Sequence, residues 1–171
     1  YEYAYIDISV RNAIGAIQID NVAFSLAKSE MLNASFEGAV ATDGSPTGWS
    51  KSAAGTTGRH SVVSDAGRSG AALLLDKTTA NGAVFSNYIP VIPGMTYEVT
   101  FYEKGDAVTS LSQVIPYYYT ASSVLGTNSA ALGTSIAAVV TLTPSADWTK
   151  RTVTFTVPDN AIAVRMAFLT R

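Results

Sequence analysis

The chain of 171 residues contains no cysteine and a single histidine. The absence of cysteine excludes disulfide bonds, thiolate catalysis and zinc–thiolate sites. Charged residues make up 14% of the chain, against roughly a quarter in ordinary soluble domains. The net charge of −2 gives no electrostatic reason to propose nucleic acid or an anionic membrane as a partner. No window approaches the roughly twenty apolar residues of a membrane helix, so the sequence predicts no membrane span.

Residues that could perform catalysis are also scarce. A serine-type triad would have to use His60, which lies within a short predicted strand and is interpreted as a surface residue of that strand. Carboxylates are scattered, and the nearest cluster is Glu98, Glu103 and Asp106. Because these residues form no recognisable acid–base pair, the sequence predicts that the protein is not an enzyme.

What the chain has in abundance is small and apolar residues. It is 47% hydrophobic, and Ser, Thr, Ala and Gly take the place of the missing charge. This composition is typical of secreted β proteins, and the length suits one ordinary domain. The chain has no initiator Met and no signal peptide, so we expect a mature or excised piece of a secreted or cell-surface protein.

Short runs with a period of two, separated by turn residues, recur along the chain. Thr96–Lys104 is the clearest run, because Tyr97, Val99 and Phe101 alternate with polar neighbours. The other expected strands are Met31–Phe36, Arg59–Ser64, Ala71–Asp76, Gly82–Tyr88 with Ile89–Ile92, Leu111–Thr120, Ile136–Thr143, Arg151–Val157 and Ala161–Arg171. Helical periodicity is almost absent. The sequence therefore predicts an all-β fold, an antiparallel β-sandwich (jelly roll) of about nine or ten strands.

The first 25 residues form a unit of their own. Tyr1–Arg11 and Ala16–Ser25 both alternate and are joined by a turn, which predicts a β-hairpin. A polar connector, Leu26–Glu30, follows it. We therefore divide the chain into an N-terminal hairpin with its connector, residues 1–30, and a sandwich, residues 31–171.

The sandwich carries a series of short motifs in a fixed order. They are Leu32–Gly38 (LNASFEG), Gly48–Trp49, Gly70–Leu75 (GAALLL), Pro93–Val99 (PGMTYEV) and Trp148 with Arg151–Pro158 (RTVTFTVP). In this order the chain resembles the jelly-roll carbohydrate-binding modules of families four, nine and twenty-two along about 140 residues. The resemblance implies a non-catalytic carbohydrate-binding-type module of an extracellular protein, with a polysaccharide or glycan as partner.

The closing strand of that family is displaced in this chain. In the family the last strand has a glycine, a β run and an Asp-Asn-Val sequence, which Gly15–Phe24 matches at the front of the chain. The hairpin could fold back onto its own domain, complete a neighbouring copy in a head-to-tail polymer, or belong to a tandem repeat. The alternative function is thus a structural subunit or repeat of an extracellular fibre, assembled with neighbouring copies through residues 1–25.

Sugar binding requires flat aromatic faces that stack on pyranose rings and polar groups that orient them. The candidates for these roles are Tyr102, Tyr117, Tyr119, Gln113 and Trp49. Tyr117 and Tyr119 share one face of their strand with Gln113, and Tyr118 lies on the opposite face.

The resemblance also implies a structural calcium ion between the first and last strands. The matching ligands in this chain are Glu37 and Asp20. Carboxylate and carbonyl oxygens are the donors that calcium prefers, so we expect calcium as a structural cofactor.

Overall fold

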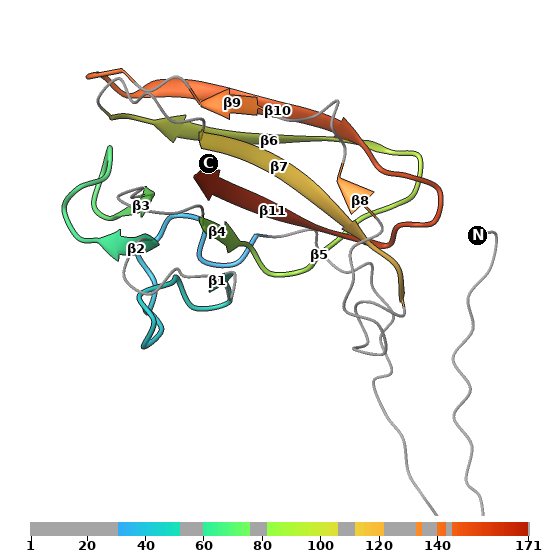
Figure 1. The fold of residues 1–171 in the computed structure, drawn as a ribbon, viewed down its shortest axis with the longest axis horizontal. Helices are drawn as coiled ribbons and strands as arrows, with labels where there is room; N and C mark the ends of the chain where they lie inside the picture. The colour runs from blue at the N-terminus through green and yellow to red at the C-terminus, as the bar shows by residue number, and fades with distance from the viewer. Residues whose placement is uncertain are drawn as a thin grey trace, which may run out of the picture.

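The computed structural model describes residues 31–51, 60–75, 82–105, 112–121, 133–134, 140–142 and 145–170. Within these ranges the chain forms eleven strands (Figure 1). They are β1 Ser50–Lys51, β2 His60–Val63, β3 Ala72–Leu75, β4 Gly82–Phe85, β5 Ile89–Pro90, β6 Thr96–Glu103, β7 Ser112–Tyr119, β8 Gly133–Thr134, β9 Val140–Leu142, β10 Thr149–Thr156 and β11 Ala163–Thr170. Within the same ranges we find no helix whose length and apolar character would suit a bilayer span. The predicted hairpin 1–25 lies outside the described residues.

The larger sheet is antiparallel and has the order β1-β4-β11-β7-β8, with β5 pairing to β11 and β9 to β7. Strand β11 is interior, because β7 pairs along all eight of its residues and β4 and β5 pair with its other edge. Its residues are apolar on both faces except at Arg165 and Thr170.

A second layer of strands covers one face of this sheet. Strands β6 and β10 pair antiparallel over eight residues, from Thr96↔Thr156 to Glu103↔Thr149. Figure 1 shows these two long strands lying over β7 and β11, and β2 and β3 form a further antiparallel pair. Tyr97, Val99 and Phe101 of β6 pack against the buried cluster between the layers. The predicted antiparallel β-sandwich is therefore confirmed.

The core between the layers comes from alternate residues of the long strands. Its fully buried members include Val84, Val114, Val153, Val164 and Met166. Burying one such side chain contributes about 1.5–3 kcal/mol relative to leaving it in water. The period-two pattern thus decides which half of each strand stabilises the sandwich.

Most predicted strands are confirmed, with ends that shift by a few residues, but the one at Met31–Phe36 is wrong. Residues 32–35 form turns, and Asn33 and the following Phe36 adopt φ of 49° and 64°. The Phe36 amide donates to the Asn33 carbonyl at 3.1 Å, and the Gly38 amide donates to Asn33 Oδ1 at 2.8 Å. Asn tolerates the left-handed region and its side chain competes for local amides, so this segment forms turns instead of a ladder.

Candidate functional site

The larger sheet has a second face, directed away from the core. Register places Arg165 opposite Tyr117 and Leu169 opposite Gln113, so these four side chains share that face. Small and aliphatic residues form its floor: Ala83, Ile115, Ala167 and Leu169. Phe85 and Tyr117 are partly buried and pack against this floor. We call this surface the second face.

Four aromatic rings and one guanidinium gather on the second face. The rings of Phe85 and Tyr117 meet edge to face at 5.3 Å, and those of Tyr88 and Tyr119 at 4.9 Å. The guanidinium carbon of Arg165 lies 5.1 Å from the ring centres of both Phe85 and Tyr88. Cation–π attraction holds the charge in this position. We call the five residues the aromatic cluster.

Hydrogen bonds to the backbone fix the orientation of Arg165. Its Nε donates to Ser86 O at 2.6 Å, and its Nη2 donates to Ser50 Oγ at 2.6 Å and to Phe85 O at 3.4 Å. The side chain therefore links β11 to β1 and to the end of β4. Arg165 was not among the candidates taken from the sequence, although it is the one charged residue between Ala161 and Thr170.

Tyr119 belongs to the same cluster but is buried, with 5% of its surface exposed. Burial raises the pKa of its phenol above 10.0, and the nearby Arg165 charge offsets part of that rise. The phenol is therefore protonated at neutral pH. Its ring supports Tyr88 and does not offer an open face for stacking.

Gln113 brings an amide to the second face beside Leu169. Its Oε1 is buried and has no hydrogen-bond partner among the described residues. A buried carbonyl oxygen without a partner loses about 1–3 kcal/mol relative to a paired one.

The two other sugar-binding candidates lie elsewhere. Tyr102 is 42% exposed on the outer side of β6, and the Arg68 guanidinium lies 4.0 Å from its ring centre. Trp49 is buried in the core, where its Nε1 donates to Leu32 O at 2.7 Å and its ring contacts Phe168. The fold thus brings together Tyr117, Tyr119 and Gln113, leaves Tyr102 on the other layer, and gives Trp49 no face for a ligand.

Of the residues considered for catalysis, His60 is enclosed by the fold and Glu103 is held in an ion pair. The prediction that His60 lies on a strand surface is wrong: its side chain is fully buried, and neither ring nitrogen has a hydrogen-bond partner among the described residues. Its place on the inner side of β2 is set by packing, which a four-residue strand of mixed polarity does not reveal. Glu103 forms an ion pair with Arg151 at 2.5 Å across β6 and β10. Asp106 lies outside the described residues.

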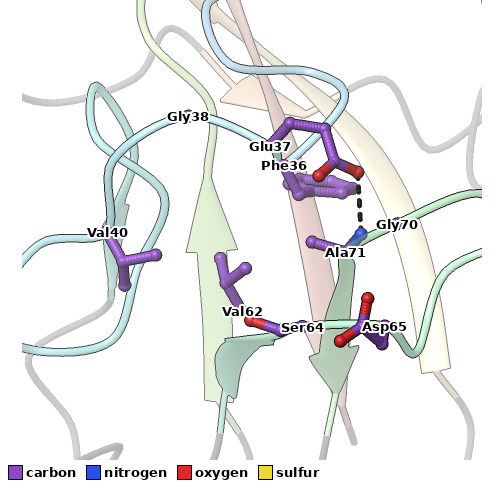
Figure 2. A pocket seen from close by; sticks show the side chains of 9 residues that line it. All are labelled: Phe36, Glu37, Gly38, Val40, Val62, Ser64, Asp65, Gly70 and Ala71. Carbon is purple, nitrogen blue, oxygen red and sulfur yellow. Dashed lines mark hydrogen bonds between the residues drawn. The ribbon is translucent and has the colours of Figure 1, made fainter.

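Glu37 lines a pocket of about 140 Å³ between the 36–40 segment and the turn after β2 (Figure 2). Its Oε1 accepts a hydrogen bond from the Ala71 amide at 2.7 Å. Gly70 has φ of 75°, and a Cβ at this position would collide with the Glu37 carboxylate. Glycine is therefore required for the carboxylate to reach the start of β3.

The residues that line this pocket can be compared with the ligands that a calcium ion requires. Asp65 and Ser64 also line it, so the described donors are two carboxylates and one hydroxyl. Calcium takes about six to eight oxygens, and no group of three acidic or histidine side chains occurs in the described part of the chain. The donor chemistry fits calcium in kind but supplies only part of a coordination shell. The other predicted ligand, Asp20, lies outside the described residues.

Comparison with known proteins decides the family. A family model described as a carbohydrate binding domain matches residues 29–171. The chain belongs to this carbohydrate-binding domain family. The resemblance inferred from the serial motifs is therefore confirmed. No curated protein matches the chain.

Two of the solved structures that are similar to the chain are a tailspike domain and a carbohydrate-binding module. One is the enzymatically active domain of tailspike protein 4 of bacteriophage CBA120, with a TM-score of 0.53 and 17% identity over 72% of this chain and 17% of that chain. The other is a family 16 carbohydrate-binding module, with a TM-score of 0.46 and 19% identity over 65% of this chain and 73% of that one. The chain thus spans 17% of the tailspike domain's length, and at such identity the likeness concerns the fold alone.

Proposed function

We propose that this domain binds a polysaccharide without catalysis, through the second face, as part of an extracellular protein. The observation that carries the proposal is the gathering of partly buried rings, Phe85, Tyr88 and Tyr117, around Arg165, on the face that also carries Gln113. An aromatic ring gives a pyranose its flat contact, and the amide orients the hydroxyl groups. Membership of the carbohydrate-binding family and the low charge of the chain support the proposal.

Affinity electrophoresis on a panel of soluble polysaccharides tests it. We expect retardation of the wild-type chain by at least one polymer, and a loss of about tenfold or more in affinity for Tyr117→Ala, because the stacking contact is removed. Tyr102→Ala is the matched control, since that ring lies on the other layer. Absence of retardation on every polymer would overturn the proposal.

The non-catalytic part of the proposal has its own assay. His60 is enclosed and Glu103 is engaged by Arg151, so neither is available as an acid or base in an open site. We expect no release of reducing ends when the chain is incubated with the polymer that it binds. Steady release that depends on chain concentration would contradict this.

We further propose that calcium binds at the Glu37 pocket and stabilises the sandwich. Glu37 and Asp65 would supply carboxylate oxygens, with Asp20, carbonyls and water completing the shell. Calcium at about a hundredfold above its Kd would add about 2.7 kcal/mol to the free energy of unfolding. We expect EDTA to lower the melting temperature of the wild type but not of Glu37→Gln. Equal melting curves with EDTA and with calcium would rule the ion out.

A second candidate function is assembly by strand donation. Strand β6 pairs with β10, and its other edge has no strand partner among the described residues. The core-facing Val99 of β6 is only partly buried, whereas Val153, directly opposite on β10, is 1% exposed. A missing neighbour at this edge would account for the difference, and an open strand edge accepts another strand. The segment Gly15–Phe24 has the alternation and length for this position.

Deletion of residues 1–25 tests whether these residues donate a strand to a neighbouring copy, close their own domain, or do neither. If a neighbouring copy receives the strand, we expect wild-type oligomers that grow with concentration in light scattering, and their loss on deletion. If the strand closes its own domain, the wild type stays monomeric and the truncated chain binds a peptide spanning residues 12–25. A truncated chain that is monomeric, equally stable and unable to bind the peptide would exclude both arrangements.

A further inference from the structure

Arg165 brings a positive charge to the second face. The other members of that face in the described ranges are aromatic, aliphatic or neutral polar residues. The ion pair that the described residues form joins Arg151 to Glu103, between β10 and β6. The guanidinium of Arg165 therefore has hydrogen-bond partners but no described carboxylate to balance its charge.

The hydrogen-bond partners of Arg165 are all neutral groups. Its bonds to Ser86 O, Ser50 Oγ and Phe85 O use Nε and Nη2 of the guanidinium, and the Tyr119 hydroxyl is a further hydrogen-bond partner. These neutral acceptors hold the fork in one orientation without neutralising it. A partly buried cation of this kind is stabilised by an anionic oxygen much more than by a neutral one.

We propose that the second face recognises an acidic glycan, a polymer with uronic acid residues whose carboxylate binds Arg165. This inference rests on the carbohydrate-binding function proposed above and specifies its ligand class. The rings beside Arg165 would pack against the pyranose. Arg165 is the one charged residue of the aromatic cluster, so charge complementarity favours an anionic ligand.

A comparison of ligands tests this with the wild-type protein. The probes are polygalacturonate and the same polymer after reduction of its carboxyl groups to alcohols. We expect affinity about tenfold higher for the acidic form, the size of effect that one charge-assisted hydrogen bond gives. We also expect the preference to shrink between 50 mM and 500 mM NaCl, since salt screens a partly exposed charge.

Variants then assign the preference to one residue. Arg165→Gln should bind both forms of the polymer alike, and Arg165→Lys should keep part of the preference. Arg68→Gln, which removes an arginine from the outer side of the other layer, should bind as the wild type does. Thermal melting of each variant checks folding, and if Arg165→Gln does not fold, the comparison of Arg165→Lys with the wild type and the ligand comparison decide.

The outcomes separate this inference from the proposed function. Binding of neutral polymers with no preference for the acidic form would overturn the inference and leave the proposed function intact. A preference that survives in Arg165→Gln would also overturn it. No binding to any polymer, acidic or neutral, would overturn the proposed function itself.

Discussion

The two faces of the larger sheet are made by the same strands but differ in what they contact. Val164, Met166 and Phe168 of β11 enter the core between the layers, whereas Arg165 and Ala167 lie on the second face. The core face is apolar and packed against β6 and β10. The second face combines an apolar floor with rings, an amide and a cation. Alternate residues of the same strands therefore either stabilise the core or place aromatic, amide and cationic side chains on the second face.

The tyrosine triplet of β7 shows the same difference within three residues. Tyr118 is 3% exposed and packs against Phe155 of the opposite layer, with ring centres 6.0 Å apart. Tyr117 points the other way and meets Phe85. Because the two residues are of the same type, the same substitution at Tyr117 and at Tyr118 compares the two faces directly.

Tyr118→Ala should have the largest effect on stability. The ring is buried between the layers and its hydroxyl approaches Thr156 O at 3.4 Å. Removal of a buried aromatic side chain costs about 3–5 kcal/mol, because the cavity that remains is only partly refilled. Urea unfolding monitored by fluorescence measures the loss. A loss below 1 kcal/mol would mean that the core face is not the stabilising one.

Tyr117→Ala should have a smaller effect on stability and a large effect on polysaccharide binding. The ring is half-buried and loses one edge-to-face partner, so we expect a stability loss of about 1–2 kcal/mol. Binding to the polysaccharide that retards the wild type in affinity electrophoresis should fall sharply, as measured by isothermal titration calorimetry. The two faces would not be functionally distinct if this variant unfolded as readily as Tyr118→Ala and bound as the wild type does.

Tyr102→Ala takes the comparison to the outer side of the second layer. The exposed ring contacts Arg68, and an exposed cation–π contact contributes about 0.5–1 kcal/mol. We expect a stability change of that order and unchanged polysaccharide affinity. A loss of affinity equal to that of Tyr117→Ala would move the binding site from the second face to β6.

Asp43→Asn should have the smallest effect, and only above acidic pH. Hydrogen bonds from Ser45 Oγ at 2.6 Å and from the Ser45 amide at 2.9 Å hold the pKa of Asp43 below 3.8. Because the folded pKa is lowered, the contribution is present above the unfolded value and disappears as pH falls through the folded one. The carboxylate is exposed, so we expect less than about 1 kcal/mol. Unfolding measured from pH 7 to pH 2.5 should show the wild type and variant converging at low pH.

Local sequence was sufficient for most strands because alternation and turn residues act over a few positions. Thr96–Lys104 and Leu111–Thr120 were predicted as strands, and the structure has Thr96–Glu103 and Ser112–Tyr119. The opposite orientations of Tyr117 and Tyr118 were predicted from the same period of two and are confirmed. At Met31–Phe36 the prediction failed, because the Asn33 side chain and two left-handed residues favour turns over alternation.

The candidate site was predicted in part. Gln113, Tyr117 and Tyr119 share a face because even numbers of residues separate them on one strand. Tyr102 and Trp49 were grouped with them by side-chain type alone, and tertiary packing separates them. Glu37 and Asp20 remain a predicted calcium pair, and the division into residues 1–30 and 31–171 remains a prediction.

The sequence by itself determined that the chain is an all-β sandwich of the carbohydrate-binding family, because periodicity and the order of motifs are properties of the chain alone. Only the tertiary structure decided what lies beside what. It enclosed His60 and Trp49, and it placed Arg165 among rings contributed by β4, β7 and the segment before β5. The physical reason is that strand pairing joins positions about 80 residues apart, such as Arg165 and Ser86, and no local pattern records such a distance.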